Sequence, residues 1–408
     1  MSTGLAAPTE RATRPWVAAI SLANAGLYTA WFGPILTLLG IQAERFAGDD
    51  KEAALAWILG IGALFSTAAN PIFGALSDRT TSRFGRRLPW IVAGTTGGVA
   101  SLVLLAFAPN LTVVTAGWCL AQLSLNANLA AITAAVPDHV PHRQRGTVGG
   151  YLGLAQTVGS VVGAGLAAAA GGITGGYLAC AAFLVIATVP YVVMRRDLVL
   201  DRADRPPFSW TTFAKGFWVS PRRHPDFAWA WLTRFLINLG FAIGLVYLLY
   251  YLDDEVGYAD PETGVFLLSA LNSLALLVTV VGAGALSDRI GRRRVFVLVA
   301  GVVMAGSTLS LGGWSTWPTT VAAVIVLGLG MGIFTSVDLA LMIDVLPEAA
   351  DRGKDLGVIN IANALPQVLA PVIAAPLVAT LGYPALYAAA AAAALAGAVL
   401  VFQIKSVR

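Results

Sequence analysis

The chain has 408 residues, of which 57% are hydrophobic and only 12% are charged, and its mean hydropathy is +0.75. Soluble domains carry about 25% charged residues, so this composition excludes a soluble protein and predicts one that crosses a membrane many times. The apolar runs do not alternate with polar residues, which excludes a β-barrel and predicts an all-α membrane protein. The net charge of +4 does not indicate a nucleic-acid partner, because the basic residues lie in loops between apolar runs.

In chain order, runs of about 20 apolar residues predict twelve transmembrane helices, since that length crosses about 30 Å of hydrocarbon. The predicted spans are 16–39, 53–76, 89–108, 111–136, 147–170, 176–194, 227–251, 263–286, 295–312, 318–345, 356–380 and 382–403. The first run is too long for a signal-peptide core, so we expect it to be retained.

The loops after the second and eighth spans carry the same motif. The first copy is Gly74-Ala-Leu-Ser-Asp78-Arg79 followed by Phe84-Gly85-Arg86-Arg87, and the second is Gly284-Ala-Leu-Ser-Asp288-Arg289 followed by Ile290-Gly291-Arg292-Arg293. The offset of about 210 residues predicts two pseudo-symmetric six-helix bundles, 1–194 and 227–408. The polar, proline-containing segment 195–226 is the predicted cytoplasmic linker, and 210–218 within it could form an amphipathic helix on the inner leaflet or an irregular tether.

Basic residues set the predicted topology. All 26 Lys and Arg residues except Arg45, Lys51 and Arg234 fall on the termini, the even-numbered loops or the linker. Loops with an excess of Lys and Arg stay cytoplasmic, so both termini are predicted to be cytoplasmic and the bilayer to be the cytoplasmic (plasma) membrane.

The doubled loop resembles the signature loop of the major facilitator superfamily, and the resemblance covers the whole chain. The longer first copy, Ser77-Asp78-Arg79-Thr80-Thr81-Ser82-Arg83-Phe84-Gly85-Arg86-Arg87, is similar to that of the sucrose and glycoside cation symporter branches. The resemblance implies a secondary active transporter whose spans one, four, seven and ten line a central cavity. It also implies a monomer with no cofactor.

The charged loops are predicted to act as gates on the cytoplasmic side. Asp78 and Asp288 lie where a helix ends, placed to accept from an adjacent helix N-terminus or from Arg86 and Arg292. Contacts of this kind can hold the cytoplasmic side shut, although the arginines could also serve topology alone. The candidate gating residues are Gly74, Asp78, Arg79, Gly85, Arg86, Arg87, Asp138, Gly284, Asp288, Arg289, Gly291, Arg292, Arg293 and Asp344.

Two ionisable residues lie at membrane depth, where a charge is expensive unless it is paired or hydrated. Arg234 is about seven residues into span seven, and Asp338 is about seven residues before the end of span ten, so at 1.5 Å per residue their depths match. We predict a switchable ion-coupling pair, with H⁺ as the coupling ion. The alternatives are an arginine that extends to the interface and a static carboxylate partner.

Amide and aromatic residues supply candidate substrate contacts. They are Asn24, Tyr28, Trp31, Gln122, Asn126, Asn128, Asn238, Tyr247, Asn272, Asn360, Asn363 and Gln367. Amides both donate and accept hydrogen bonds, so with aromatic stacking faces they suit a neutral, sugar-like solute. They would equally suit a polar drug carried by a proton-driven exporter, and any one of them could instead bridge helices.

Other classes of function lack their motifs. The chain has no His-Glu-x-x-His, no Gly-x-Ser-x-Gly and no phosphate-binding loop, and its three histidines lie in loops. A membrane enzyme or a sensor is therefore the weaker interpretation, and no metal site is expected.

The predicted topology can be checked by cysteine labelling in a background without Cys119 and Cys180. Single cysteines at Asp50 and Asp254 should react with a membrane-impermeant thiol reagent in intact cells, whereas one at Asp204 should react only after the cells are opened. Labelling at Asp204 in intact cells would contradict the topology.

Overall fold

A computed structural model describes residues 10–141, 144–194, 197–201, 203, 222–290, 292–345 and 352–405. These residues form helices and short connections, with no strand among them. The chain divides into two compact units, Met1–Pro207 and Phe208–Arg408, and the division falls inside the predicted linker. The possible amphipathic helix at 210–218 lies outside the described residues.

The first unit holds seven α-helices joined by short turns. They are α1 Arg14–Gly33, α2 Leu39–Ala47, α3 Lys51–Asp78, α4 Leu88–Ala106, α5 Leu111–His139, α6 Arg145–Ala169 and α7 Ile173–Met194. A π-helical stretch, Pro34–Leu38, joins α1 to α2, and a 3₁₀ turn, Gly48–Asp50, joins α2 to α3. Local sequence explains several starts: Pro15 and Pro89 occupy first-turn positions of α1 and α4, and the Asn110 side chain accepts from the Val113 amide at the start of α5.

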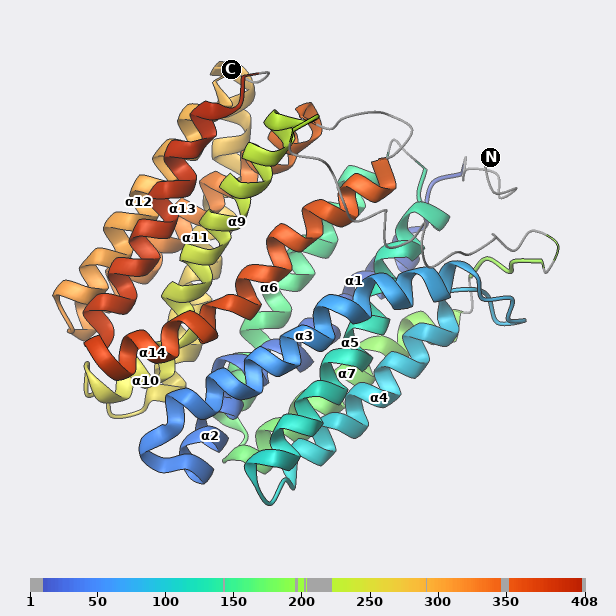
Figure 1. The fold of residues 1–408 in the computed structure, drawn as a ribbon. Coiled ribbons are helices and arrows are strands. Elements are labelled where there is room, and N and C mark those ends of the chain that lie inside the picture. The colour runs from blue at the N-terminus through green and yellow to red at the C-terminus, as the bar shows by residue number, and fades with distance from the viewer. Residues whose placement is uncertain are drawn as a thin grey trace. The chain divides into compact units, whose positions relative to one another are not determined.

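The second unit repeats this arrangement with fewer, longer helices. They are α9 Pro225–Val246, α10 Leu248–Asp254, α11 Pro261–Ile290, α12 Arg293–Gly313, α13 Trp317–Asp344 and α14 Arg352–Leu400, followed by a 3₁₀ turn, Val401–Gln403. Within α14, Gly382 has φ 77° and ψ −178°, which separates two helices. Figure 1 shows α14 doubling back on itself from orange to red. A positive φ of this size favours glycine.

The helices of the described chain account for all twelve predicted spans. Ten helical stretches are long and apolar enough to cross a membrane. The longest, Arg14–Asp78, contains two predicted spans, and Ile361–Gln403 covers 382–403 and most of 356–380. The predicted bounds agree with the helix bounds to within two residues for 53–76, 89–108, 147–170, 295–312 and 318–345. The first predicted span continues through Pro34–Leu38 into α2, and the seventh is divided between α9 and α10. The all-α membrane fold predicted from the apolar runs is therefore confirmed.

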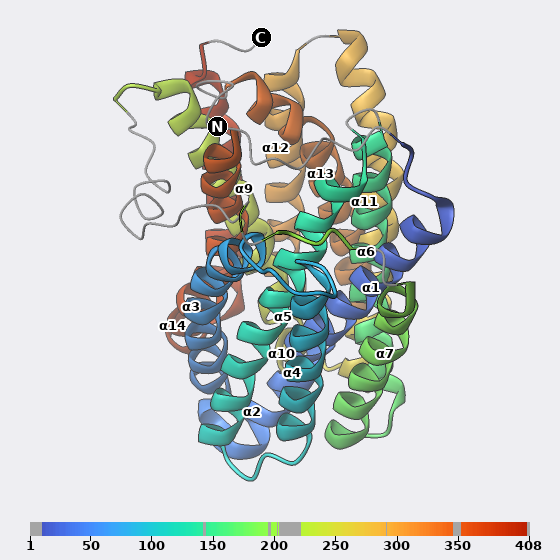
Figure 2. The same ribbon diagram turned by 90° about the vertical axis from the view of Figure 1, so that its right-hand side faces the viewer.

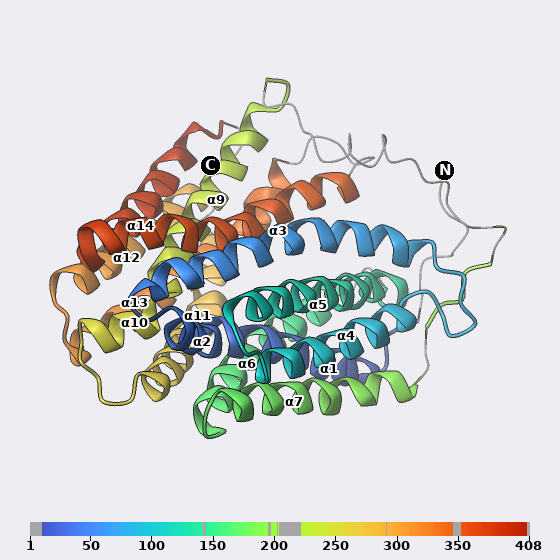
Figure 3. The same cartoon turned by 60° about the horizontal axis from the view of Figure 1, so that its bottom comes forward.

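The two units pack their helices by the same pattern, as the repeat requires. In the first unit α1 packs on α6 and α7, while α5 packs on α3 and α4; α4 lies between α5 and α7 (Figure 2 and Figure 3). In the second unit α9 packs on both parts of α14, while α13 packs on α11 and α12. Glycines permit the close approaches: a Cβ at Gly240 of α9 would lie 2.7 Å from the Ala390 carbonyl oxygen of α14.

Candidate functional site

The first charged loop closes onto the ends of α3 and α5 in one ion-pair network. We call Ser77, Asp78, Arg86, Arg87 and Asp138 the loop cluster. Asp138 accepts from Arg86 Nε at 3.0 Å and from Arg87 Nε at 2.9 Å, and Arg86 Nη2 contacts its other oxygen. Arg87 also reaches Asp78 Oδ1 at 2.5 Å through Nη2 and contacts the Ser77 hydroxyl through Nη1. One guanidinium therefore connects the ends of both helices.

The carboxylates of Asp78 and Asp138 differ in solvent exposure. The side chains of Arg87 and Asp138 are 3% and 7% exposed, while that of Asp78 is 55% exposed. Burial by itself lowers the pKa of Arg87, but Asp78 and Asp138 more than offset this effect and hold the pKa above its ordinary value. Water screens an exposed carboxylate more than a buried one, and Asp138 in addition pairs with both arginines.

The partner predicted for Asp78 is wrong in one respect. Both hydrogen-bonded contacts of the Arg86 guanidinium go to Asp138, and Arg87 is the residue that reaches Asp78. Arg87 precedes α4 directly and its side chain turns back toward the end of α3, whereas Arg86 faces α5. Arg79 also takes part in an interaction, and a side chain at Gly74 would meet open space.

The second copy of the motif is only partly described. Arg292 precedes α12 and is exposed, and Arg293 is partly buried and interacts with neighbours. Gly291 lies outside the described residues. So do the side-chain environments of Gly284, Asp288, Arg289, Asp344 and Asn360. The gating assignment of these residues remains a prediction.

Within the second unit, the two predicted membrane-depth charges meet. Arg234 Nη1 of α9 lies 2.9 Å from Asp338 Oδ2 of α13, and the two side chains are 12% and 10% exposed. Arg234 Nε donates to Asn363 Oδ1 of α14 at 2.8 Å, and Asn238 Nδ2 donates to the Arg234 carbonyl at 2.8 Å and to Asn363 Oδ1 at 3.4 Å. We call Arg234, Asn238, Asp338 and Asn363 the central cluster.

The ion pair of the central cluster is held by charge rather than by a directed hydrogen bond. Arg234 Nη1 makes no contact of hydrogen-bond geometry among the described residues, although it lies within 2.9 Å of the carboxylate. Among the described residues, the guanidinium is fixed by the hydrogen bond from Nε to Asn363. A carboxylate with one poorly directed cationic partner keeps oxygen lone pairs that a proton could occupy.

In the first unit, a hydrogen-bond chain crosses three helices at amide and aromatic residues. Trp31 Nε1 of α1 donates to Gln122 Oε1 of α5 at 2.9 Å, and Asn126 Nδ2 donates to Ser66 Oγ of α3 at 2.9 Å and to the Gln122 carbonyl at 2.8 Å. The Tyr28 ring lies 6.1 Å from that of Trp31. The structure thus brings four predicted substrate-contact residues together, and adds Ser66, which the sequence did not single out.

Other predicted substrate-contact residues are engaged in helix packing. Asn128 is fully buried and donates to Thr95 Oγ1 of α4 at 2.8 Å. Asn24 donates to the Leu152 carbonyl of α6, and Asn272 to the Val324 carbonyl of α13, each at 2.9 Å. Tyr247 is 1% exposed beside the Tyr250 ring. Gln367 is exposed on α14, apart from the central cluster's hydrogen bonds.

Asp197 is a further polar residue at the first charged loop that the sequence did not single out. It follows α7, and its carboxylate accepts from the backbone amides of Arg87 and Leu88 at 2.6 and 2.7 Å. The only signal in the sequence is an acidic residue directly after the sixth span and its two arginines. Its significance depends on tertiary contact with a loop 110 residues away.

Comparison with known proteins identifies the family. The model of the Major Facilitator Superfamily matches residues 17–282 and 249–407. The chain therefore belongs to the Major Facilitator Superfamily, a family of membrane transporters rather than of enzymes, and it is an integral, multi-pass membrane protein. The sucrose and glycoside symporter branch is supported only loosely.

Individual relatives match over part of their length. An uncharacterized symporter of Synechocystis sp. is 58% identical over 68 residues, 15% of this chain and 12% of that one. The general alpha-glucoside permease of Schizosaccharomyces pombe is 27% identical over 170 residues, 36% and 29% of the two chains. The multidrug transporter AQR1 of Candida glabrata is 28% identical over 198 residues, 47% and 32%. The matched stretches thus span a third or less of each relative.

Solved structures share the fold. A POT family transporter in complex with a thioalcohol-conjugated peptide aligns with a TM-score of 0.76 at 12% identity, covering 95% of both chains. The nucleoside transporter NupG aligns with a TM-score of 0.74 at 13% identity, covering 96% of this chain and 100% of that one.

The loop cluster predicts a graded response to loss of charge. Asp138→Asn should increase cytoplasmic-side alkylation of a single cysteine at the exposed Thr335 of α13 by more than Asp78→Asn does, because the Asp138 carboxylate is buried and pairs with both arginines. Asp78→Asn should have a smaller effect in the same direction and leave expression intact. The measurement is the alkylation rate in inverted vesicles. Unchanged rates in both variants would reduce the loop to a topology signal.

Proposed function

We propose that the protein is a secondary active transporter that moves a small organic solute across the membrane by alternating access, driven by H⁺, with a neutral, sugar-like solute favoured. The observation that carries the proposal is the central cluster. There, at membrane depth, Arg234 pairs with Asp338 and also donates a hydrogen bond to the Asn363 amide oxygen. A buried charge pair of this kind marks ion pathways and relays in membrane proteins.

In the proposed mechanism, Asp338 is the proton carrier and Arg234 responds to its charge. While Asp338 is ionised, its charge attracts the Arg234 guanidinium and so holds α9 to α13. Protonation removes that attraction, and Arg234 remains hydrogen-bonded to Asn363 of α14, so the balance of contacts shifts from α13 to α14. Proton release on the opposite side of the membrane restores the pair. Proton binding thereby changes how α9 packs against α13 and α14.

The central cluster also offers a substrate contact. Asn363 Oδ1 accepts from Arg234 and Asn238, and both asparagines were predicted to contact substrate. A solute hydroxyl that replaced one of these bonds would alter the same guanidinium that Asp338 controls. Substrate and proton would then act on one residue, which is the requirement for coupling.

The substrate class rests on the amides and rings of the first unit. Gln122 and Asn126 supply donors and acceptors, and Trp31 and Tyr28 supply aromatic faces. This combination suits hydroxyl groups on an apolar ring skeleton. The name of the alpha-glucoside permease relative agrees with a sugar-like solute.

The second candidate is a proton-driven exporter of drugs or metabolites. The same amides and rings would suit a mixed polar and aromatic molecule, and one relative is named a multidrug transporter. For either function we propose a monomer in the cytoplasmic membrane with both termini inside. The same proposal assigns bundles 1–194 and 227–408, a linker at 195–226, and no enzymatic activity.

A coupling role for Asp338 can be separated from a structural role with three variants. Asp338→Asn alone should lower stability, because an unpaired buried Arg234 costs about 3–5 kcal/mol. Arg234→Gln with Asp338→Asn should restore the thermal midpoint and exchange solute down its gradient, yet fail to concentrate it in sealed vesicles with an imposed proton gradient. Asp49→Asn, at an exposed carboxylate, is the control. Concentrative, protonophore-sensitive transport by the double variant would exclude the coupling role.

The substrate class can be tested by ligand-dependent stabilisation of the purified protein. A ligand at 100 times its Kd stabilises the folded state by about 2.7 kcal/mol, so a transported solute should raise the thermal midpoint measurably. We expect neutral mono- or disaccharides to do so, and Gln122→Ala to abolish the shift. Stabilisation by hydrophobic drugs and not by any sugar would favour the exporter.

A further inference from the structure

Asp197 and its neighbour Leu198 join the segment after α7 to the first charged loop through three hydrogen bonds. Its Oδ2 accepts from the backbone amides of Arg87 and Leu88 at 2.6 and 2.7 Å, and its Oδ1 accepts from the Leu198 amide at 2.8 Å. The Arg86 amide in turn donates to the Leu198 carbonyl at 2.9 Å. The backbones of both loop-cluster arginines are therefore tied to residues 197 and 198.

The Asp197 carboxylate serves as the cap of α4. The helix begins at Leu88, and the residue at its N-cap position, Arg87, makes no side-chain capping bond. The first amides of a helix lack partners within the helix and carry partial positive charge, so a carboxylate is the most favourable group to receive them. Asp197 supplies from a distant part of the chain what the local sequence does not.

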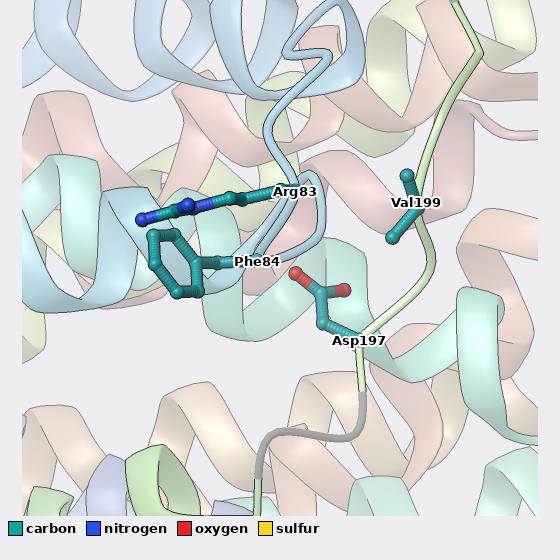
Figure 4. A pocket seen from close by; sticks show the side chains of 4 residues that line it. All are labelled: Arg83, Phe84, Asp197 and Val199. Carbon is teal, nitrogen blue, oxygen red and sulfur yellow. The ribbon is translucent and has the colours of Figure 1, made fainter.

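The absence of a side chain at Gly85 leaves room for the Asp197 carboxylate. Its φ is 101°, a conformation that favours glycine, and a Cβ at this position would overlap the side chain of Asp197. Figure 4 shows the Asp197 carboxylate directed toward the loop, while the Arg83 side chain extends away from it over the Phe84 ring. The glycine of the motif thus provides both a turn and a docking surface.

The three carboxylates at this site bind different parts of the loop. Asp138 and Asp78 take the guanidinium groups, whereas the hydrogen bonds to Asp197 come from backbone amides. Asp197 consequently does not compete for the arginines. It fixes the backbone from which both side chains project.

We infer that Asp197 is a positioning residue that holds Arg86 and Arg87 in register with Asp138 and so ties the start of the 195–226 segment to the loop cluster. This inference rests on the proposed gating role of that cluster.

The test compares Asp197→Ala with Asp201→Asn, an exposed carboxylate of the same segment. Hydrogen exchange of the peptide covering residues 84–90 reports the docking directly. Asp197→Ala should speed exchange of the Arg87 and Leu88 amides about tenfold or more, since each loses its acceptor. Asp197→Asn, which keeps one acceptor oxygen, should give an intermediate rate, and Asp201→Asn should match the wild type.

A second readout distinguishes positioning from general stabilisation. Alkylation of the cysteine at Thr335 from the cytoplasmic side should rise in Asp197→Ala, and adding Asp138→Asn should raise it no further, because both changes act through the same arginines. Additive effects would overturn the inference in favour of a merely stabilising role, as would wild-type exchange of residues 84–90. If Asp138→Asn itself leaves alkylation unchanged while exchange in Asp197→Ala is fast, the gating role fails and the docking stands.

Discussion

The cost of placing charge in an apolar medium organises this structure. A charge at membrane depth must be paired, and the described structure meets that requirement at Arg234 and Asp338 with an ion pair joined to an amide network. Buried amides elsewhere find carbonyl or hydroxyl partners on neighbouring helices, as Asn24 and Asn272 do. The same rule at the ends of the helices produces the loop cluster, in which the nearly buried Arg87 lies between two carboxylates. Helix packing and polar chemistry are therefore set by one constraint.

The internal repeat preserves packing while the chemistry diverges. Equivalent helix pairs contact each other within each unit, and the alignment of Pro137 with Pro347 places Asn128 opposite Asp338 in the sequence. Yet Asn128 donates to Thr95 of α4, whereas Asp338 pairs with Arg234 of α9. The two aligned positions thus differ both in residue type and in the neighbouring helix that they contact. A duplicated fold can thus hold a charge site in one half and an uncharged polar network in the other.

The conformation of the loop cluster depends on residues that are distant in the sequence. Its arginines are adjacent in sequence and share Asp138 of α5, but only Arg87 also pairs with Asp78 of α3 in the described structure. That division requires a defined backbone at residues 85–88, which Asp197 and Leu198 provide. The glycine in the motif is needed because a carboxylate from the end of α7 occupies the space where its side chain would be.

The sequence by itself determined the class of fold, the positions of the spans and the duplication, because hydrocarbon thickness imposes a length and composition that are legible residue by residue. It also identified Arg234 and Asp338 as a pair, since only two ionisable residues lie well inside the spans and their depths match. Tertiary structure decided which partner each polar group takes. Asn128 donates to Thr95, Asp78 pairs with Arg87 rather than with Arg86, and Asp197 caps α4. Such choices depend on angles between helices and on contacts more than 100 residues apart, as between Asp197 and Leu88, which no local pattern encodes.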